Sequence, residues 1–277
     1  MKEALEKLPP LRDILAHYDL LPQKKLGQNF LLDLNITDKI ARSAGPIAGH
    51  NVLEIGPGPG GLTRSILKQG PRKFYAIEKD PRCLNALQGL RVAAGGILEL
   101  ISADALSFDE ATLEQPLKVI ANLPYNIGTE LIFKWLEELP RFSDFTLMLQ
   151  KEVAERIVAE PGGAAYGKLS VMCQWKCETN ILFNLPPEVF YPPPKVTSSV
   201  IHLKPRPAPL YPAAEESLRK VVQAGFNQRR KMLRGSLKTL SPEIEAQLES
   251  IGIAPTARPE DISIADFCKI ARTLFPE

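Results

Sequence analysis

The residues from Asn122 to Tyr125 could together bind and modify the exocyclic amine of a purine base. They read Asn122-Leu123-Pro124-Tyr125, so an amide, a proline-fixed turn and an aromatic ring occupy consecutive positions after an apolar run. The Asn122 side-chain oxygen and the Leu123 carbonyl can each accept one N–H of the amine, while Tyr125 can stack on the base. Two acceptors would hold the nitrogen toward tetrahedral geometry with its lone pair aimed at a methyl group, as methylation of adenine N6 requires. The alternative interpretation is a turn after a strand with a packed tyrosine.

Two carboxylates could hold a nucleoside beside this turn. Glu78 ends a strand-like run about 20 residues after the first glycine of a glycine-rich loop, where an acid can accept both hydroxyls of a ribose. Asp104 ends the next strand-like run, where it can accept from an adenine amine while the following backbone N–H reaches a ring nitrogen. Glu78 could instead be a solvated acid, and Asp104 a turn residue or helix cap.

The glycine-rich loop 56–61 indicates which nucleoside ligand fits. It lies between an apolar run and an amphipathic segment, a pattern that predicts a buried strand, a tight turn and a helix start. Glycines such as Gly56 let a ligand lie against the main chain. Their spacing also matches the dinucleotide pattern G-x-G-x-x-G, but Pro57 and Pro59 lack the N–H groups that a pyrophosphate needs. S-adenosylmethionine, an adenosine ligand without phosphate, therefore fits better than the nicotinamide cofactor of an oxidoreductase.

These candidate residues stand at the ends of expected strands in an α/β pattern. Strand-like apolar runs alternate with helix-like amphipathic segments, which is typical of a mainly parallel sheet covered by helices. The carboxyl ends of such strands form a cleft, so the polar residues should converge there. We therefore expect strands at 52–55, 73–78, 97–103, 118–121, 145–149, 181–185 and 199–203.

Two further segments could border the cleft. The stretch 23–33 mixes basic, amide and aromatic residues and could form a lid, with Asn29 and the backbone of Leu31 as polar contacts. The proline-rich loop 187–196 could offer Phe190 as a second stacking face for a base. The alternative interpretations are a loop before a helix cap and a loop that protects a sheet edge.

A proline-rich stretch at 204–212 should form a stiff linker between two domains. We predict a ligand-binding domain over 1–206, which includes the lid, and a helical domain over 207–277.

From 219 to 238 the chain has seven basic residues and no acid, which favours contact with a polyanion over a solvated helix face. The net charge is only +2, so a nucleic-acid surface must be local, and we assign it to Arg229, Arg230, Lys231 and Arg234.

The composition is that of an ordinary intracellular protein with a sizeable core, at 44% hydrophobic and 24% charged residues. We expect a cytoplasmic protein without membrane contact, because no apolar run approaches the roughly 20 residues of a membrane helix and no signal-peptide core begins the chain. The four cysteines lack disulfide spacing, which suits a reducing compartment. Cys173 and Cys177 have no third ligand nearby, so we expect core packing rather than a metal site.

The motifs as a set resemble the ribosomal RNA adenine N6-dimethyltransferase family, and most of all its small-subunit branch with eukaryotic and mitochondrial relatives. The resemblance covers nearly the whole chain, from Gln28 to an expected helix at 226–231. Each motif alone is common, but their combination is specific. In chain order they are Gln28-Asn29-Phe30-Leu31, Glu54-x-Gly56-x-Gly58-x-Gly60, Glu78, Asp104, Asn122-Leu123-Pro124-Tyr125 and Val189-Phe190-x-Pro192-x-Pro194-x-Val196.

The resemblance implies a seven-stranded Rossmann-like methyltransferase sheet with a reversed last strand and a small C-terminal helical domain. The implied reaction is S-adenosylmethionine-dependent dimethylation of two adjacent adenosines in a hairpin loop near the 3′ end of small-subunit rRNA. The implied substrate is a pre-assembled small ribosomal particle, and we expect a monomer. Asn122 and Tyr125 would grip the target adenine, with Phe190 opposite. The implied cofactor contacts are Asn29, Leu31, Gly56, Glu78, Asp104 and Asn122.

Other functions share these motifs. One is a large-subunit rRNA methyltransferase of the antibiotic-resistance type, which would prefer naked large-subunit RNA. Another is a non-catalytic nucleic-acid-binding assembly factor, against which the intact Asn122-Leu123-Pro124-Tyr125 argues. Mitochondrial-type relatives can also serve in transcription or assembly, so the cellular role is more open than the chemistry.

Overall fold

The computed structural model describes residues 1–23, 27–228 and 231–276, which form two compact units. One unit is Met1–Ala154 with Asn180–Pro205, and the other is Glu155–Thr179 with Arg206–Glu277. This division differs from the one predicted at 206/207, because 155–179 belong with the C-terminal helices. Main-chain hydrogen bonds show why: the Arg206 N–H donates to the Lys176 carbonyl, and the Leu210 N–H to the Trp175 carbonyl, each at 2.8 Å.

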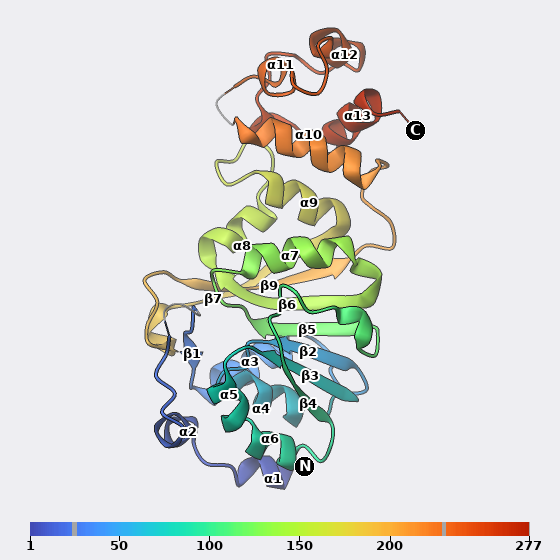
Figure 1. The fold of residues 1–277 in the computed structure, drawn as a ribbon. Helices are drawn as coiled ribbons and strands as arrows, with labels where there is room; N and C mark the ends of the chain where they lie inside the picture. Colours follow the sequence, from blue (N-terminus) through green and yellow to red (C-terminus); the bar gives the residue numbers. More distant parts are fainter. Residues whose placement is uncertain (24–26, 229–230, 277) are drawn as a thin grey trace. The chain divides into compact units, whose positions relative to one another are not determined.

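The first unit is built on a seven-stranded sheet in the order β4-β3-β2-β5-β6-β9-β7 (Figure 1). Strands β2 to β6 pair in parallel, and β9 runs antiparallel to β6, which confirms the Rossmann-like sheet with a reversed last strand. A separate ladder joins the short strands β1 and β8. The strands are β1 (Phe30–Leu31), β2 (Asn51–Ile55), β3 (Lys73–Glu78), β4 (Leu98–Ser102), β5 (Leu117–Asn122), β6 (Phe142–Gln150), β7 (Cys177–Leu185), β8 (Phe190–Tyr191) and β9 (Ser198–Pro205).

α-Helices connect the parallel strands, as the alternating pattern predicted, except between β4 and β5, where the only helical segment of the described connection is the 3₁₀ turn Glu110–Thr112. Helix α4 begins directly after the glycine loop, and α3 begins after Asp33, whose side chain accepts from the Asn35 N–H as a helix cap. Among the described residues, no helix is long and apolar enough to cross a membrane. The helices of this unit are α1 (Lys2–Glu6), α2 (Leu11–His17), α3 (Leu34–Ser43), α4 (Gly61–Lys68), α5 (Pro81–Ala86), α6 (Gln88–Ala93) and α7 (Gly128–Glu137), with the first residues of α8 (Lys151–Val158).

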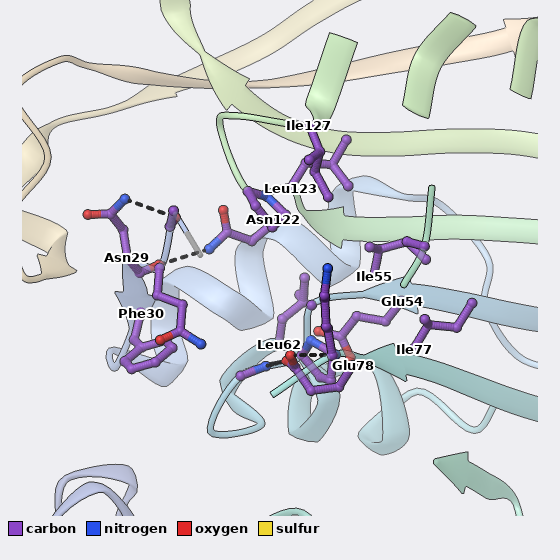
Figure 2. A pocket seen from close by; sticks show the side chains of 18 of the residues that line it. Asn29, Phe30, Glu54, Ile55, Leu62, Ile77, Glu78, Asn122, Leu123 and Ile127 are labelled. Atoms are coloured by element: carbon purple, nitrogen blue, oxygen red, sulfur yellow. Dashed lines mark hydrogen bonds between the residues drawn. The ribbon is translucent and has the colours of Figure 1, made fainter. Parts of the chain in front are cut away.

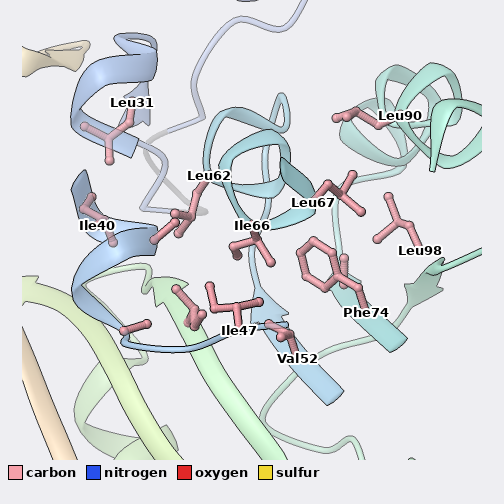
Figure 3. Close-up of a cluster of buried hydrophobic side chains, with 14 of the residues drawn as sticks. Leu31, Ile40, Ile47, Val52, Leu62, Ile66, Leu67, Phe74, Leu90 and Leu98 are labelled. Carbon is pink, nitrogen blue, oxygen red and sulfur yellow. The ribbon is translucent and has the colours of Figure 1, made fainter. Parts of the chain in front are cut away.

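Both faces of the sheet are covered, so the strands carry apolar side chains in both directions. On one face, α3 and α4 pack Ile40 and Ile66 against Val52 and Phe74 (Figure 3). Successive strand side chains alternate between faces, so Phe145 points away from that cluster. There Trp135 of α7 stacks on the Phe145 ring, with the ring centroids 5.5 Å apart. Side chains of the strands thus pack against helices on both faces of the sheet.

The second unit is helical and has its own aromatic core. Phe226 lies between the rings of Tyr166 and Phe267, at centroid distances of 6.0 and 5.6 Å. Cys173 and Cys177 are buried, as predicted. The prediction of one helix across 226–231 is wrong, because α10 ends at Asn227 and Lys231 lies in a bend. The helices here are the rest of α8, α9 (Lys168–Lys176), α10 (Glu215–Asn227), α11 (Leu233–Ser236), α12 (Ile244–Ser250) and α13 (Ile264–Leu274).

Candidate active site

A pocket of about 250 Å³ lies where the carboxyl ends of β2, β3, β4 and β5 meet the segment 27–31 (Figure 2). Parallel strands end at the same edge of a sheet, so residues far apart in sequence meet there. The structure brings together every predicted cofactor contact and the whole turn 122–125. These lining residues are Asn29, Leu31, Gly56, Glu78, Asp104, Asn122, Leu123, Pro124 and Tyr125.

The glycine loop packs tightly against the N-terminal segment. Gly58 has φ of +55°, in the left-handed region that favours glycine. A Cβ at Gly58 would lie only 3.0 Å from the Phe30 ring, so this ring packs directly on the main chain. The Gly56 N–H donates to the Ile77 carbonyl at 2.9 Å and ties the loop to β3. Bare main chain therefore forms this wall of the pocket.

Gly61, the first residue of α4, should tolerate no side chain. A Cβ there would lie 2.6 Å from the Leu31 carbonyl oxygen, a main-chain atom that cannot rotate away. We expect Gly61→Ala to lower the free energy of unfolding by about 1–3 kcal/mol, as overpacking does, and to weaken binding of the nucleoside ligand expected from the sequence, because Leu31 lines the pocket. Thermal unfolding and calorimetric titration measure the two effects.

Gly89→Ala in α6 is the matched control for this prediction. Its Cβ would meet Leu8 at 3.7 Å, an ordinary contact, and alanine favours a helix over glycine. The control should therefore be as stable as the unmodified protein or more so. Equal stability of the Gly61→Ala and Gly89→Ala variants would contradict the close approach of α4 to Leu31.

Glu78 anchors the pocket as well as lining it. Its carboxylate accepts three main-chain N–H groups, from Gly58 at 3.1 Å and from Lys79 and Asp80 at 2.8 Å each. Burial raises the pKa of Glu78, and these three hydrogen bonds oppose the rise. A carboxylate has about four acceptor positions, so one remains for a ligand hydroxyl. Glu78 can therefore bind a ligand while it fixes the shape of the glycine loop.

Glu54 is a second buried carboxyl group at this site; it belongs to the glycine-loop motif but was not predicted as a site residue. It is 1% exposed, and the Thr63 hydroxyl donates to it at 2.7 Å. Burial raises the pKa of Glu54, the Thr63 hydrogen bond opposes this rise and the charge of Glu78 adds to it, so that the pKa is about 8. The signal in the sequence was a single acid inside an otherwise apolar strand. Such a group gains a proton at neutral pH unless a cation lies beside it.

Asp104 and Lys79 form an ion pair at the pocket. The Lys79 Nζ lies 2.7 Å from an Asp104 carboxylate oxygen, and the other oxygen accepts the Leu106 N–H at 3.1 Å. The Lys79 hydrogen bond, followed by that from Leu106, lowers the pKa of Asp104. Asp104 is therefore ionised at neutral pH and half-exposed, where a ligand amine can reach it.

The orientation of the Asn122 amide is fixed by its neighbour. Its Nδ2 donates to the Asn29 carbonyl oxygen at 3.1 Å, and Figure 2 shows the side chain directed at that main chain. A carbonyl oxygen can only accept, so the nitrogen of the amide must face Asn29 and Oδ1 must face away from it. Asn122 thus presents an acceptor of defined direction at the end of β5.

The turn that follows Asn122 is held at both ends. The Leu123 N–H donates to the Met148 carbonyl at 3.2 Å, and the Pro124 carbonyl accepts from Ile127 and Gly128. Tyr125 is half-buried in this turn, and its hydroxyl lies 2.6 Å from the Ser198 hydroxyl. No motif or spacing predicted this partner, which lies on β9.

Phe190 is not among the residues that line this pocket, and its role as a second stacking face for a base stays a prediction. Phe190 pairs with Leu31 in the β1–β8 ladder. This pairing directs its ring into the hydrophobic cluster around Ile40 and Leu62, where only 4% of Phe190 is exposed. Phe190 thus supports the segment that carries Leu31.

The predicted nucleic-acid contacts belong to the second unit. Arg229 and Arg230 lie outside the described residues. Lys231 is exposed, and Arg234 of α11 is 47% exposed at its side chain and 3.7 Å from Glu245. Both described residues are thus accessible to a ligand.

Residues 21–275 match the family model described as ribosomal RNA adenine dimethylase. Proteins named ribosomal RNA small subunit methyltransferase A from Ruegeria sp. (strain TM1040) and Paracoccus denitrificans (strain Pd 1222) are each 57% identical to this chain over 275 residues, and each alignment covers 98% of both chains.

Two solved structures are similar in fold. The dimethyladenosine transferase from Plasmodium falciparum has a TM-score of 0.71 and 26% identity, with 86% of this chain and 94% of that chain covered. The 23S rRNA methyltransferase ErmE has a TM-score of 0.70 and 27% identity, with 89% and 99% covered. The similarity thus extends over both units of the chain.

Proposed function

Because this chain belongs to the ribosomal RNA adenine dimethylase family, we propose that it methylates N6 of two adjacent adenosines near the 3′ end of small-subunit rRNA. The methyl donor is S-adenosylmethionine, and the products are N6,N6-dimethyladenosines in a hairpin loop. The relatives named for the small subunit are 57% identical, whereas the large-subunit enzyme ErmE is 27% identical. This difference favours the small-subunit substrate.

The charges in the pocket fit S-adenosylmethionine. The described lining includes three acids, Glu54, Glu78 and Asp104, and one basic residue, Lys79, which is paired with Asp104. Carboxylates favour a cationic ligand that carries hydroxyl and amine donors, and disfavour a pyrophosphate. When bound, S-adenosylmethionine supplies a methyl group on a positively charged sulfur.

Five residues of the chain would lie against this ligand. Glu78 would accept from the ribose through its remaining acceptor position, and Asp104 from the adenine amine. Gly56 and Leu31 would contact the ligand through main chain that no side chain covers. The buried Glu54 carboxyl group would lose its proton and become negatively charged beside the cation.

The observation that carries the proposal is the fixed Asn122 amide. Its Oδ1 and the Leu123 carbonyl would each accept one N–H of the target adenine, which orients the N6 lone pair. The amine is a weak nucleophile because its lone pair is conjugated with the ring, so alignment lowers the barrier most. Tyr125 would stack on the base, which must first leave its place in the RNA at a cost of a few kcal/mol.

The proton needs no dedicated base in this scheme. N6 becomes cationic and strongly acidic after the methyl transfer, so the proton can leave to water. The second transfer requires that the monomethylated amine return to Asn122 with room for the first methyl group. The reaction would therefore proceed in three steps: the site captures the base, orients N6 and transfers a methyl group twice.

The basic segment of the second unit should supply RNA affinity that depends on salt. Lysine and arginine contacts to phosphates release counterions, so the affinity for RNA falls steeply as salt rises. We expect the combined Ala substitution of Arg229, Arg230 and Lys231 to flatten this slope by about 2–3 units in log Kd against log salt, at unchanged cofactor affinity.

A charge-matched control shows whether the change in slope comes from this segment or from the lower net charge of the protein. Ala at Lys2, Lys7 and Arg91, all exposed in the first unit, removes the same charge and should preserve the slope. Equal slopes for both triple variants, measured by filter binding to small ribosomal particles, would remove this segment from the RNA site.

The choice of substrate tests the proposal against its alternative. The protein should methylate small ribosomal particles that lack these modifications, and should leave naked large-subunit RNA unmodified. Transfer to the large-subunit RNA alone would instead assign the antibiotic-resistance type of activity.

A further inference from the structure

Ser198 contacts the proposed active site from a distant part of the chain. Its hydroxyl lies 2.6 Å from the Tyr125 hydroxyl, although the two residues are 73 positions apart. Ser198 is fully buried and is the first residue of β9, where it pairs with Gln150 of β6. It belongs to no motif element assigned to the site above.

The two partners of this hydrogen bond differ in how firmly they are held. Ser198 is fixed by the ladder between β9 and β6. Tyr125 lies in the turn after β5, and its ring orientation depends on two side-chain torsions. A hydrogen bond at the far end of the ring removes this freedom, because the ring is then held at both the Cβ and the hydroxyl.

The orientation of the ring matters because stacking requires parallel planes at a defined separation. Burial raises the pKa of Tyr125, so its phenol keeps its proton through the neutral range and the hydrogen bond persists there. A buried serine hydroxyl also needs a partner, and Tyr125 provides it.

We propose that Ser198 is a positioning residue for capture of the target adenine, and that its hydroxyl sets the plane of the Tyr125 ring on which the base stacks. This inference rests on the proposed function and extends it to a residue of β9. Ser198 acts through Tyr125 and does not contact the reacting atoms.

A double-mutant cycle tests the proposal. Ser198→Ala and Tyr125→Phe break the same hydrogen bond from opposite ends, so each should lower the single-turnover methylation rate by about fivefold, the factor for one net hydrogen bond. The double variant should be no slower than either single variant, and the affinity for S-adenosylmethionine should stay unchanged. Rate losses that multiply in the double variant, or a normal rate in both single variants, would overturn the proposal.

Ser199→Ala is the matched control. Ser199 is equally buried on the same strand, and its hydroxyl donates to the Asn184 side chain at 2.7 Å instead of to the pocket. This variant should keep the normal rate. Thermal unfolding verifies that each variant is folded, and Tyr125→Phe still tests the hydrogen bond should Ser198→Ala fold poorly.

A second readout separates this inference from the proposed function. A 2-aminopurine base at the target position of the rRNA in a small ribosomal particle loses fluorescence when it stacks on an aromatic ring. Quenching should be strong with the unmodified protein and Ser199→Ala, and weaker with Ser198→Ala. A protein that quenches the probe but transfers no methyl group would refute the proposed function alone. Equal quenching by the two serine variants would refute the role of Ser198.

Discussion

Asn122→Ala should lower the single-turnover methylation rate by about 100-fold or more, the scale for losing one preorganised polar group in an active site. The effect follows from the geometry at the end of β5. The Asn29 carbonyl fixes the amide, so Oδ1 holds the position in which it orients the N6 lone pair. RNA affinity should change far less, because phosphate contacts and base stacking supply most of it.

Asn122→Asp tests the orientation itself. Aspartate keeps one acceptor toward the base but places a second oxygen against the Asn29 carbonyl, where a donor is required. We expect a large rate loss here too, although the side chains are nearly the same size. The rates are compared at saturating RNA and cofactor, and a near-normal rate in Asn122→Ala would refute the lone-pair mechanism.

Glu78→Ala should weaken S-adenosylmethionine binding by about 2–3 kcal/mol, the range for hydrogen bonds to a charged group. The variant loses the acceptor for the ribose. It also loses the carboxylate that accepts three main-chain N–H groups, among them that of Gly58. Calorimetric titration gives the Kd directly. Glu99→Ala on the adjacent strand β4 removes an exposed acid and should bind normally.

A folded Glu78→Ala variant with unchanged Kd would exclude Glu78 from the cofactor site. Loss of binding together with a lower midpoint of thermal unfolding would instead assign part of the effect to the glycine loop. The comparison with Glu99→Ala at equal stability separates these two contributions.

The sequence predicted the sheet and most of the pocket because both depend on local patterns. Apolar runs mark the parallel strands, and polar residues directly after them must meet at one edge, as Glu78 and Asn122 do. Local patterns do not predict contacts between segments that are far apart in the sequence. The Ser198–Tyr125 hydrogen bond depends on the placement of β9 beside β6, which no residue spacing reveals.

The local structure at Phe190 could not be predicted from its motif. Its neighbouring prolines and aromatic residues predicted a loop, whereas the structure has a short strand there, β8, which pairs with β1 and places Phe190 beside Leu31. The grouping of 155–179 with the C-terminal helices also depends on contacts between distant segments. Examples are the hydrogen bond from Arg206 to Lys176 and the packing of Tyr166 against Phe226.

The most direct test of the proposed activity is to identify the methylated nucleosides. Small ribosomal particles that lack the modification are incubated with the protein and isotope-labelled S-adenosylmethionine, and the rRNA is digested and mapped by mass spectrometry. We predict labelled N6,N6-dimethyladenosine at two adjacent positions in a hairpin loop near the 3′ end of small-subunit rRNA. Absence of label from these adenosines, or label on another base or on large-subunit RNA, would contradict the proposal.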